Sequence, residues 1–308
     1  MVDQSGYVPH VAVDLDDTVH TAEGYIFANV WNKFLHPWDF GWVENGYHPP
    51  GGVRYIQPNE KPGVGMRPLE VFQHFINMWD LDPRKAHPVL LQELRLDQKQ
   101  LQLLSQNWDS IPKGERTGLW AQTLESARVG IQIDLVREIG VIEVPGALNM
   151  LGRFKEQGFA VSVVTSGPTQ YALEVMQRLQ LAQDGPNGFE SQLIDGFVAG
   201  DMVRNPKPDP EGLRFAEQIV HERSGLNGRD LRTVAVIGDS FADAGLARNA
   251  GVMALIRPEH LQPDDIRLMK ENMGDRLHLF DDWEKVDPSL YIEGSIGLEG
   301  KHGRGPEF

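Results

Sequence analysis

A short apolar segment that ends in crowded carboxylates constrains this chain more than any other stretch. Residues 11–13 are apolar, and Asp14, Asp16 and Asp17 follow directly. Apolar runs of this kind form strands that are buried on both faces of a parallel sheet. Carboxylates at the end of such a strand repel one another, and a hard divalent cation would stabilise their charges. The segment therefore predicts a buried strand with an acidic site at its carboxyl end.

The spacing of these acids suggests a division of chemical roles. In an extended chain Asp14 and Asp16 point to one side and Asp17 to the other. Two carboxyl groups that face one site can act as nucleophile and as proton carrier. An acidic loop without chemistry is the alternative, because so short a motif recurs by chance.

Composition excludes several classes of protein. The hydrophobic fraction of 41% is that of a globular protein, and the net charge of -15 argues against a broad nucleic-acid or anionic-membrane surface. The chain has no cysteine, which rules out disulfides and thiolate chemistry. No apolar run approaches the ~20 residues that span a bilayer, and no signal peptide is evident. We expect a cytoplasmic protein without a membrane segment.

The region 21–144 differs in texture from the rest of the chain. Residues 49–68 are rich in Gly and Pro and predict a long loop, whereas 68–79, 90–104 and 117–139 have apolar residues at helical spacing. Most of the tryptophans lie in this region: Trp31, Trp38, Trp42, Trp79, Trp108 and Trp120. Its length is sufficient for a small domain of its own.

Beyond residue 145, strand and helix patterns alternate. The predicted helices cover 146–157, 169–181, 210–222 and 242–250, and the predicted strands cover 159–164, 194–202, 233–237 and, as the last, 252–256. Such alternation is typical of a parallel α/β sheet. Because the first strand precedes residue 14, the sheet must be interrupted by the region 21–144. We expect one domain from 1–20 and 145–290, an insertion at 21–144, and an irregular Gly-rich tail at 291–308.

Three further polar sites follow the ends of predicted strands or lie between them. Thr165-Ser166-Gly167 offers a hydroxyl and backbone N–H groups at a strand-to-helix turn, which suits a phosphate oxygen. Lys207 lies between two prolines that stiffen its backbone. Asp239 and Asp243 begin a helix after an apolar strand, where they could also serve as helix caps. Ligands bind at the carboxyl ends of strands in open α/β sheets, so these residues predict one shared site.

In this order of motifs the chain resembles the haloacid dehalogenase-like (HAD) superfamily of aspartate-nucleophile phosphatases. The resemblance rests on Asp14-Leu15-Asp16-Asp17-Thr18, Thr165, Lys207 and Gly238-Asp239-Ser240-Phe241-Ala242-Asp243. It implies a Rossmann-like three-layer α/β core with a parallel sheet. The insertion at 21–144 has the position of the family's inserted, mainly α-helical cap of the first type.

The resemblance also implies a mechanism. Asp14 would attack phosphorus and form an aspartyl-phosphate, while Asp16 would protonate the leaving group and then activate water. Mg²⁺ would be held by Asp14, Asp239 and the backbone carbonyl of Asp16. Phosphate would be bound by Thr165 with Ser166 and Gly167, and by Lys207. Asp243 would orient either the ligands of the metal or Lys207.

The expected activity is Mg²⁺-dependent hydrolysis of a small phosphorylated metabolite. A phosphotransferase such as a sugar phosphomutase, and a non-catalytic binding module on the same fold, are the alternatives. His20, Arg54 and Arg67 are candidate substrate contacts from the cap or its flap, although we expect His20 to be a histidine at the surface. No sequence feature names a protein partner.

Overall fold

The computed structural model describes residues 7–21, 98–185, 188–223 and 230–293, and the single positions 72, 73, 76, 77, 82, 84 and 96. The chain divides into two compact units, one formed by Met1–Thr21 with Val141–Phe308 and the other by Ala22–Gly140. Whether the second unit is a cap stays a prediction. Of the predicted tail 291–308, the first residues belong to the short helix α11 (Leu290–Glu293), and those after 293 lie outside the described residues.

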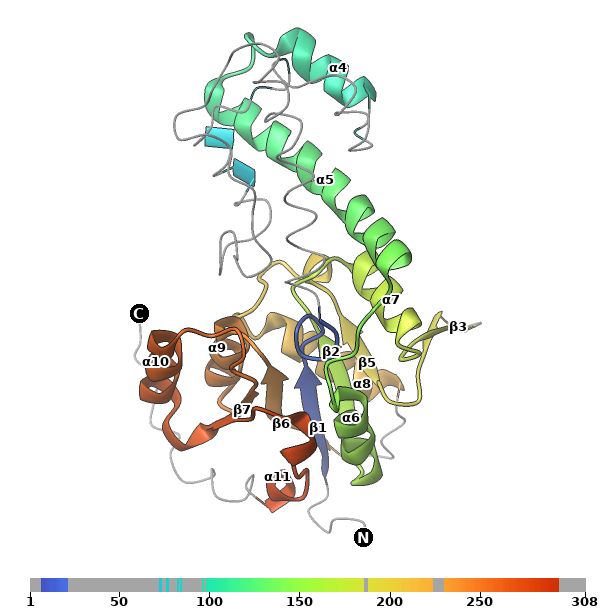
Figure 1. The fold of residues 1–308 in the computed structure, drawn as a ribbon, viewed down its shortest axis with the longest axis vertical. Coiled ribbons are helices and arrows are strands. Elements are labelled where there is room, and N and C mark those ends of the chain that lie inside the picture. The colour runs from blue at the N-terminus through green and yellow to red at the C-terminus, as the bar shows by residue number, and fades with distance from the viewer. Residues whose placement is uncertain are drawn as a thin grey trace. The chain divides into compact units, whose positions relative to one another are not determined.

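A six-stranded sheet of parallel strands forms the centre of the first unit (Figure 1), which confirms the predicted α/β sheet. The spatial order is β5 (Gly196–Val198), β2 (Ala160–Val164), β1 (Tyr7–Val13), β6 (Asp230–Gly238), β7 (Met253–Ile256) and β8 (Leu277–Leu279). From β1 the chain builds outward through β2 to β5, and then returns to the other side of β1 at β6. The strand order therefore reverses between β1 and β6, which places the topological switch point there.

The apolar sequence of the central strands explains why they lie in the middle. Every residue of β1 after Tyr7 is buried. All residues of β2 and the last residues of β6 are buried too. A strand that is covered by helices on both faces needs apolar side chains in both directions.

The prediction that residues 252–256 form the last strand is wrong. After β7 the chain forms α10 (Pro263–Met273) and then β8, which pairs with β7 at the edge of the sheet. β8 contains only Leu277, His278 and Leu279, all partly exposed. So short an edge strand carries no apolar run, and the pattern therefore missed it. A small hairpin, β3 (Gln183–Gly185) with β4 (Gly188–Glu190), was not predicted either.

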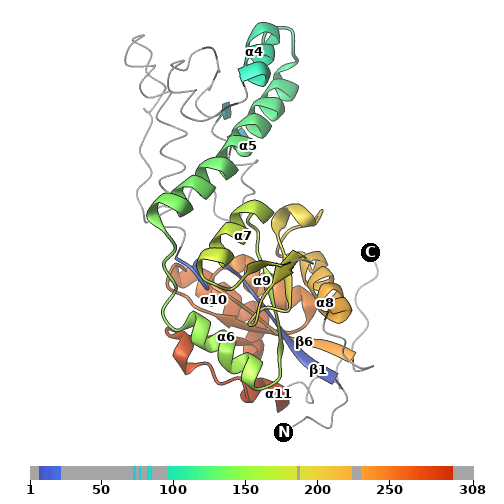
Figure 2. The ribbon, with the colours of Figure 1, turned by 90° about the vertical axis from the view of Figure 1, so that its right-hand side faces the viewer.

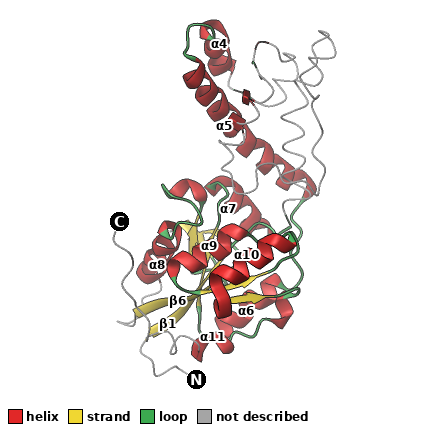
Figure 3. Ribbon diagram, turned by 90° about the vertical axis from the view of Figure 1, so that its left-hand side faces the viewer, coloured by secondary structure: helices red, strands yellow, loops and turns green. Residues whose placement is uncertain are grey.

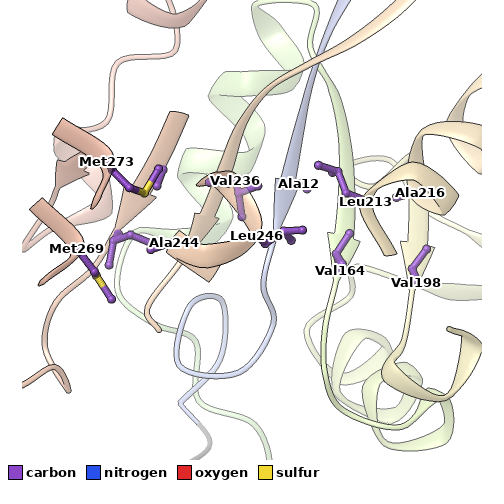
Figure 4. Packing of buried hydrophobic residues seen from close by; sticks show 13 residues of the cluster. Ala12, Val164, Val198, Leu213, Ala216, Val236, Ala244, Leu246, Met269 and Met273 are labelled. Carbon is purple, nitrogen blue, oxygen red and sulfur yellow. The ribbon is translucent and has the colours of Figure 1, made fainter. Parts of the chain in front are cut away.

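Helices cover both faces of the sheet (Figure 3). α8 (Glu211–Arg223), α9 (Phe241–Ala250) and α10 share one apolar cluster with the strands. Its members include Leu213, Leu246 and Met269 from the helices and Val164 and Val236 from the strands (Figure 4). α6 (Ala147–Glu156) packs against β2 and against the 3-10 turn Trp283–Lys285, and it lies near α11 (Figure 2).

Helix ends follow the local signals of the sequence. α6 stops just before Gly158, which has a φ of 84°, and α9 is closed by Gly251, with a φ of 76°. Glycine adopts this left-handed conformation without a steric penalty. The predicted helices at 169–181 and 210–222 are confirmed as α7 (Thr169–Arg178) and α8.

The second unit contains two long described helices. α4 (Gln98–Asn107) and α5 (Lys113–Ile139) overlap the helices predicted at 90–104 and 117–139. Of the helix predicted at 68–79, positions 72, 73, 76 and 77 are described and are helical. Within the described parts of the chain, no helix is long and apolar enough to cross a membrane.

A chain of polar side chains crosses the interior of the sheet at His10. The ring of His10 on β1 contacts Thr233 Oγ1 on β6 at 2.7 Å and Ser162 Oγ on β2 at 2.8 Å, and the Thr233 hydroxyl in turn donates to Glu217. His10 has no exposed surface. Burial lowers its pKa from 6.5 to about 3, because the charged imidazolium loses its hydration there.

This neutral histidine predicts a loss of stability in mild acid. Below pH 6.5 His10 binds a proton in the unfolded chain, whereas in the folded protein it stays unprotonated until about pH 3. The contribution of His10 to the free energy of unfolding is therefore fully present above pH 6.5 and declines as the pH falls below that value. The free energy of unfolding should fall by about 2 kcal/mol between pH 8 and pH 5 from this group alone. Urea denaturation of wild type and His10→Gln at both pH values isolates the effect. An equal decline in the two proteins would contradict it.

Candidate active site

Two carboxylates lie at the switch point of the sheet. Asp14 follows β1 and Asp239 follows β6, and the Asp14 N–H donates to the carbonyl of Ile237 at 2.8 Å. Both side chains are buried. Because β1 and β6 are parallel neighbours, their carboxyl ends meet at one edge, where open α/β sheets bind their ligands.

The ammonium group of Lys207 joins Asp14 to Asp243. Lys207 Nζ lies 2.5 Å from Asp14 Oδ1 and 2.6 Å from Asp243 Oδ1. The side chain of Lys207 is only 5% exposed, and that of Asp243 is fully enclosed. A lysine that the sequence places in a Pro-rich loop far along the chain therefore lies in the same buried cluster as the first acid.

Burial and charge set the protonation of this cluster. Burial raises the pKa of the Asp14 carboxyl to about 8, because the Lys207 ammonium compensates only partly and the neighbouring Asp243 and Asp16 raise it further. Burial alone would lower the pKa of Lys207, but the carboxylates of Asp14 and Asp243 more than reverse this and raise it. Lys207 is therefore charged. A bound cation would oppose the rise at Asp14, since it favours the ionised form.

The carboxylates of this cluster fit a hard divalent cation. Asp14, Asp239 and Asp243 each offer an oxygen, and these oxygens lie within 4.8 Å of one another. Asp243 already accepts from Lys207 at Oδ1 and from Ser240 at Oδ2. Asp14 and Asp239 are therefore the better placed direct ligands, and oxygen donors of this kind suit Mg²⁺. The sequence predicted that Asp16 binds the metal through its backbone carbonyl. Its side chain is not one of these three carboxylates.

The turn after β2 brings Thr165 beside Asp16. A Cβ atom on Gly167 would lie 3.4 Å from Thr165 Oγ1 and 3.5 Å from Asp16 Oδ2, so both oxygens face this glycine. Thr165 is buried, whereas Ser166 is exposed. The Gly167 N–H, which the sequence suggested as a free donor, donates to Thr165 Oγ1 at 3.0 Å.

The loop after β1 does not keep the extended form on which the alternation argument relied. The N–H groups of Val19 and His20 both donate to the Leu15 carbonyl, and Asp17 has a φ of 54°. The chain thus folds into a tight turn. The premise of an extended chain is therefore wrong beyond the end of the strand. Asp14 contacts Lys207 and Asp16 contacts other partners, and the expectation that both acids face one site stays a prediction.

His20 is buried, which contradicts the expected surface histidine. Its ring has no exposed surface, and Nε2 lies 3.3 Å from Asp16 Oδ1 and 3.0 Å from the hydroxyl of Tyr171. The turn explains this position, because it returns His20 to Asp16, with which it forms a backbone bridge. Arg54 and Arg67 lie outside the described residues.

Sequence reasoning missed two residues of the site. The Tyr171 hydroxyl donates to Asp16 Oδ1 at 2.8 Å. Trp283, near the other end of the chain, donates from Nε1 to the carbonyl of Thr18 at 2.9 Å and so holds the loop after β1. Both follow ordinary helix or turn patterns in the sequence, and no local signal distinguishes them.

Comparisons with known proteins identify similar sequences and folds. A family model described as haloacid dehalogenase-like hydrolase matches residues 8–251. Over 120 residues the chain is 30% identical to a phosphoglycolate phosphatase of Cupriavidus necator, and the matched region covers 39% of this chain and 45% of that protein. Over 121 residues it is also 30% identical to the N-acetylmuramic acid 6-phosphate phosphatase of Pseudomonas putida, and that matched region covers 39% of this chain and 47% of that protein. The chain thus spans about half the length of the curated relatives that it matches.

Solved structures resemble the fold over nearly the whole chain. CbbY from Rhodobacter sphaeroides, solved in complex with phosphate, has a TM-score of 0.52 at 15% identity and covers 91% of this chain and 96% of its own. A HAD hydrolase of family IA, variant 3, from Entamoeba histolytica has a TM-score of 0.54 at 12% identity and covers 92% and 99%. At these identities the likeness concerns the fold alone.

Gly238 at the end of β6 allows Asp243 to approach the strand. A Cβ atom there would lie 2.3 Å from Asp243 Cγ, so Gly238→Ala must displace this carboxylate. We expect the free energy of unfolding to fall by about 1–3 kcal/mol. Gly152→Ala in α6, where a Cβ atom meets nothing within 4 Å, is the matched control and should raise it by about 0.5–1 kcal/mol. Urea denaturation measures both, and a Gly238→Ala protein as stable as wild type would show that Asp243 is not closely packed.

Proposed function

This chain belongs to the haloacid dehalogenase-like hydrolase family, and we propose that it is a Mg²⁺-dependent phosphomonoester hydrolase that forms an aspartyl-phosphate on Asp14. The observation that carries the proposal is the buried Asp14 carboxylate, held by Lys207 beside Asp239 at the switch point of the sheet. The relatives named as phosphatases support the same reaction class. The substrate would be a small phosphorylated metabolite.

The proposed first step is attack by Asp14 on phosphorus. A bond forms between a carboxylate oxygen of Asp14 and phosphorus, and the bond to the ester oxygen breaks with its electron pair leaving on that oxygen. Attack by one anion on another is opposed by repulsion, and the ammonium of Lys207, 2.5 Å from Asp14, offsets part of it. Asp14 and Asp239 would hold Mg²⁺, which would supply further positive charge to the site when bound.

Asp16 is the proposed proton carrier. As a general acid it would give its proton to the departing ester oxygen, and as a base it would then take a proton from the water that cleaves the aspartyl-phosphate. The position of Asp16 Oδ2 supports this role, because it faces Gly167 together with the Thr165 hydroxyl, where a phosphoryl group would lie.

Residues around these two acids would bind phosphate and orient the cation. The Thr165 hydroxyl would contact a phosphoryl oxygen, with Ser166 and Gly167 in the same turn. Asp243 accepts from Lys207 and from Ser240, which supports a role in orienting the ammonium rather than in direct metal binding. The unit Ala22–Gly140 would act as the cap that confers substrate specificity and excludes water.

The reaction can be tested by phosphate release. Wild type should release phosphate from members of a panel of sugar phosphates, nucleotides and small organic phosphates with Mg²⁺ present. Asp14→Asn should lower the rate about a thousandfold or more, since it removes the nucleophile. Asp281→Asn is the matched control, because it removes an exposed carboxylate that pairs with Lys285 at 2.7 Å, and it should keep full activity. Activity that persists in Asp14→Asn rejects the nucleophile, and isomerised ester without free phosphate would indicate a mutase.

Metal binding can be tested without turnover. Mg²⁺ at a hundredfold excess over its Kd should stabilise the folded protein by about 2.7 kcal/mol, and EDTA should reverse this. Asp239→Asn should lose the stabilisation, whereas Asp281→Asn should keep it. Thermal unfolding with and without Mg²⁺ provides the measurement. Equal stabilisation of wild type and Asp239→Asn would place the cation elsewhere.

A further inference from the structure

Two residues that the mechanism leaves unused converge on one oxygen of Asp16. We propose that Tyr171 and His20 are positioning residues that fix Asp16 Oδ1, so that Oδ2 alone handles the proton of the reaction. This inference rests on the proposed function. It adds residues of this chain that control where the proton carrier points.

The three side chains form a closed triangle. The Tyr171 hydroxyl lies 2.8 Å from Asp16 Oδ1, His20 Nε2 lies 3.3 Å from the same oxygen, and Nε2 is 3.0 Å from the Tyr171 oxygen. The other oxygen, Oδ2, faces Gly167 and Thr165. A carboxylate has two equivalent oxygens that exchange by rotation about the last side-chain bond. Hydrogen-bond donors on Oδ1 prevent this rotation and direct Oδ2 toward the turn at residues 165–167.

The protons of the triangle can be assigned from its partners. The single hydroxyl proton of Tyr171 points to Asp16 Oδ1, because this oxygen is an acceptor whether the carboxyl group is ionised or carries its proton on Oδ2. The Tyr171 oxygen then accepts, so His20 must carry its proton on Nε2, which faces that oxygen and Asp16. His20 Nδ1 is buried and has no hydrogen-bond partner among the described residues. This favours an unprotonated Nδ1, because a buried N–H without an acceptor costs free energy. His20 thus donates to this pair through Nε2.

Backbone contacts hold both donors rigidly. Neither His20 nor Tyr171 has exposed surface. The His20 N–H donates to the Leu15 carbonyl, and its backbone bridges both Asp16 and Glu143. Tyr171 lies in the first turn of α7, which begins shortly after the turn at residues 165–167. Groups fixed in this way can hold a third side chain in one orientation, and misplacement of a reacting group by about 1 Å can cost about a hundredfold in rate.

The identity of the leaving group separates this role from a purely structural one. An alkyl phosphate needs a proton on its departing oxygen, whereas p-nitrophenyl phosphate releases a stable anion without one. The ratio kcat/KM reports only the steps up to release of the first product, so the later hydrolysis of the aspartyl-phosphate does not enter it. A misdirected Asp16 should therefore lower kcat/KM for the alkyl ester selectively.

The decisive variant is Tyr171→Phe, assayed with glycerol phosphate and p-nitrophenyl phosphate. We expect kcat/KM to fall about tenfold to a hundredfold for the alkyl ester and less than about threefold for the aryl ester. Tyr291→Phe is the matched control, because it removes the hydroxyl of another buried tyrosine that contacts a histidine, His278 Nδ1, at 3.2 Å. It should leave the ratio of the two substrates unchanged.

A second pair of variants tests His20 independently of Tyr171. His20→Gln keeps an N–H donor close to the position of Nε2 and should retain most of the alkyl-ester activity, whereas His20→Leu should lose it in the pattern of Tyr171→Phe. Circular dichroism confirms that each variant is folded. Equal loss on both esters, or no loss on either, overturns the inference while an active wild type leaves the proposed function in place. A wild type that hydrolyses neither ester, nor any member of the phosphate panel, rejects both.

Discussion

The buried contact of Lys207 with Asp14 and Asp243 is the interaction on which the rest of the site depends. It joins a Pro-rich loop, the end of β1 and the first turn of α9 through one ammonium group. Removal of one partner from such a buried pair costs several kcal/mol, about 3–5 in measured cases, because the other charge stays behind without compensation. The remaining negative charge of the cluster is what a divalent cation would neutralise. Stability and the proposed chemistry are therefore linked through the same atoms.

The parallel sheet makes this contact possible. β1, β2 and β6 are neighbours, so the polar residues that follow them emerge at one edge. Gly238 contributes by its lack of a side chain, since a Cβ atom there would occupy the space of Asp243. Trp283 then ties the loop after β1 to the C-terminal part of the same unit by a hydrogen bond to Thr18. Rigid strands and a fastened loop together give the acids fixed positions.

The two acids of the first motif have different surroundings, and this difference fits a division of roles. Asp14 is buried beside a charged lysine and two further carboxylates, where a cation would bind. Asp16 contacts the donors Tyr171 and His20 and is partly exposed. Enzymes that assign an attacking role and a proton-transfer role to two carboxyl groups do so by such contrasts in environment.

Local patterns were sufficient to determine the alternating strands and helices, the acidic strand end and the motif order, because each depends on residues close together in the sequence. The partners of those residues were decided by tertiary structure. Tyr171 and Asp16 are 155 positions apart. The hydroxyl of an otherwise ordinary helical tyrosine reaches the acid only because the fold brings the start of α7 to the loop after β1. His20 was expected at the surface because the tight turn that buries it has no apolar pattern. The three-residue edge strand β8 was missed for the same reason: its place depends on pairing with β7, which its own side chains do not encode.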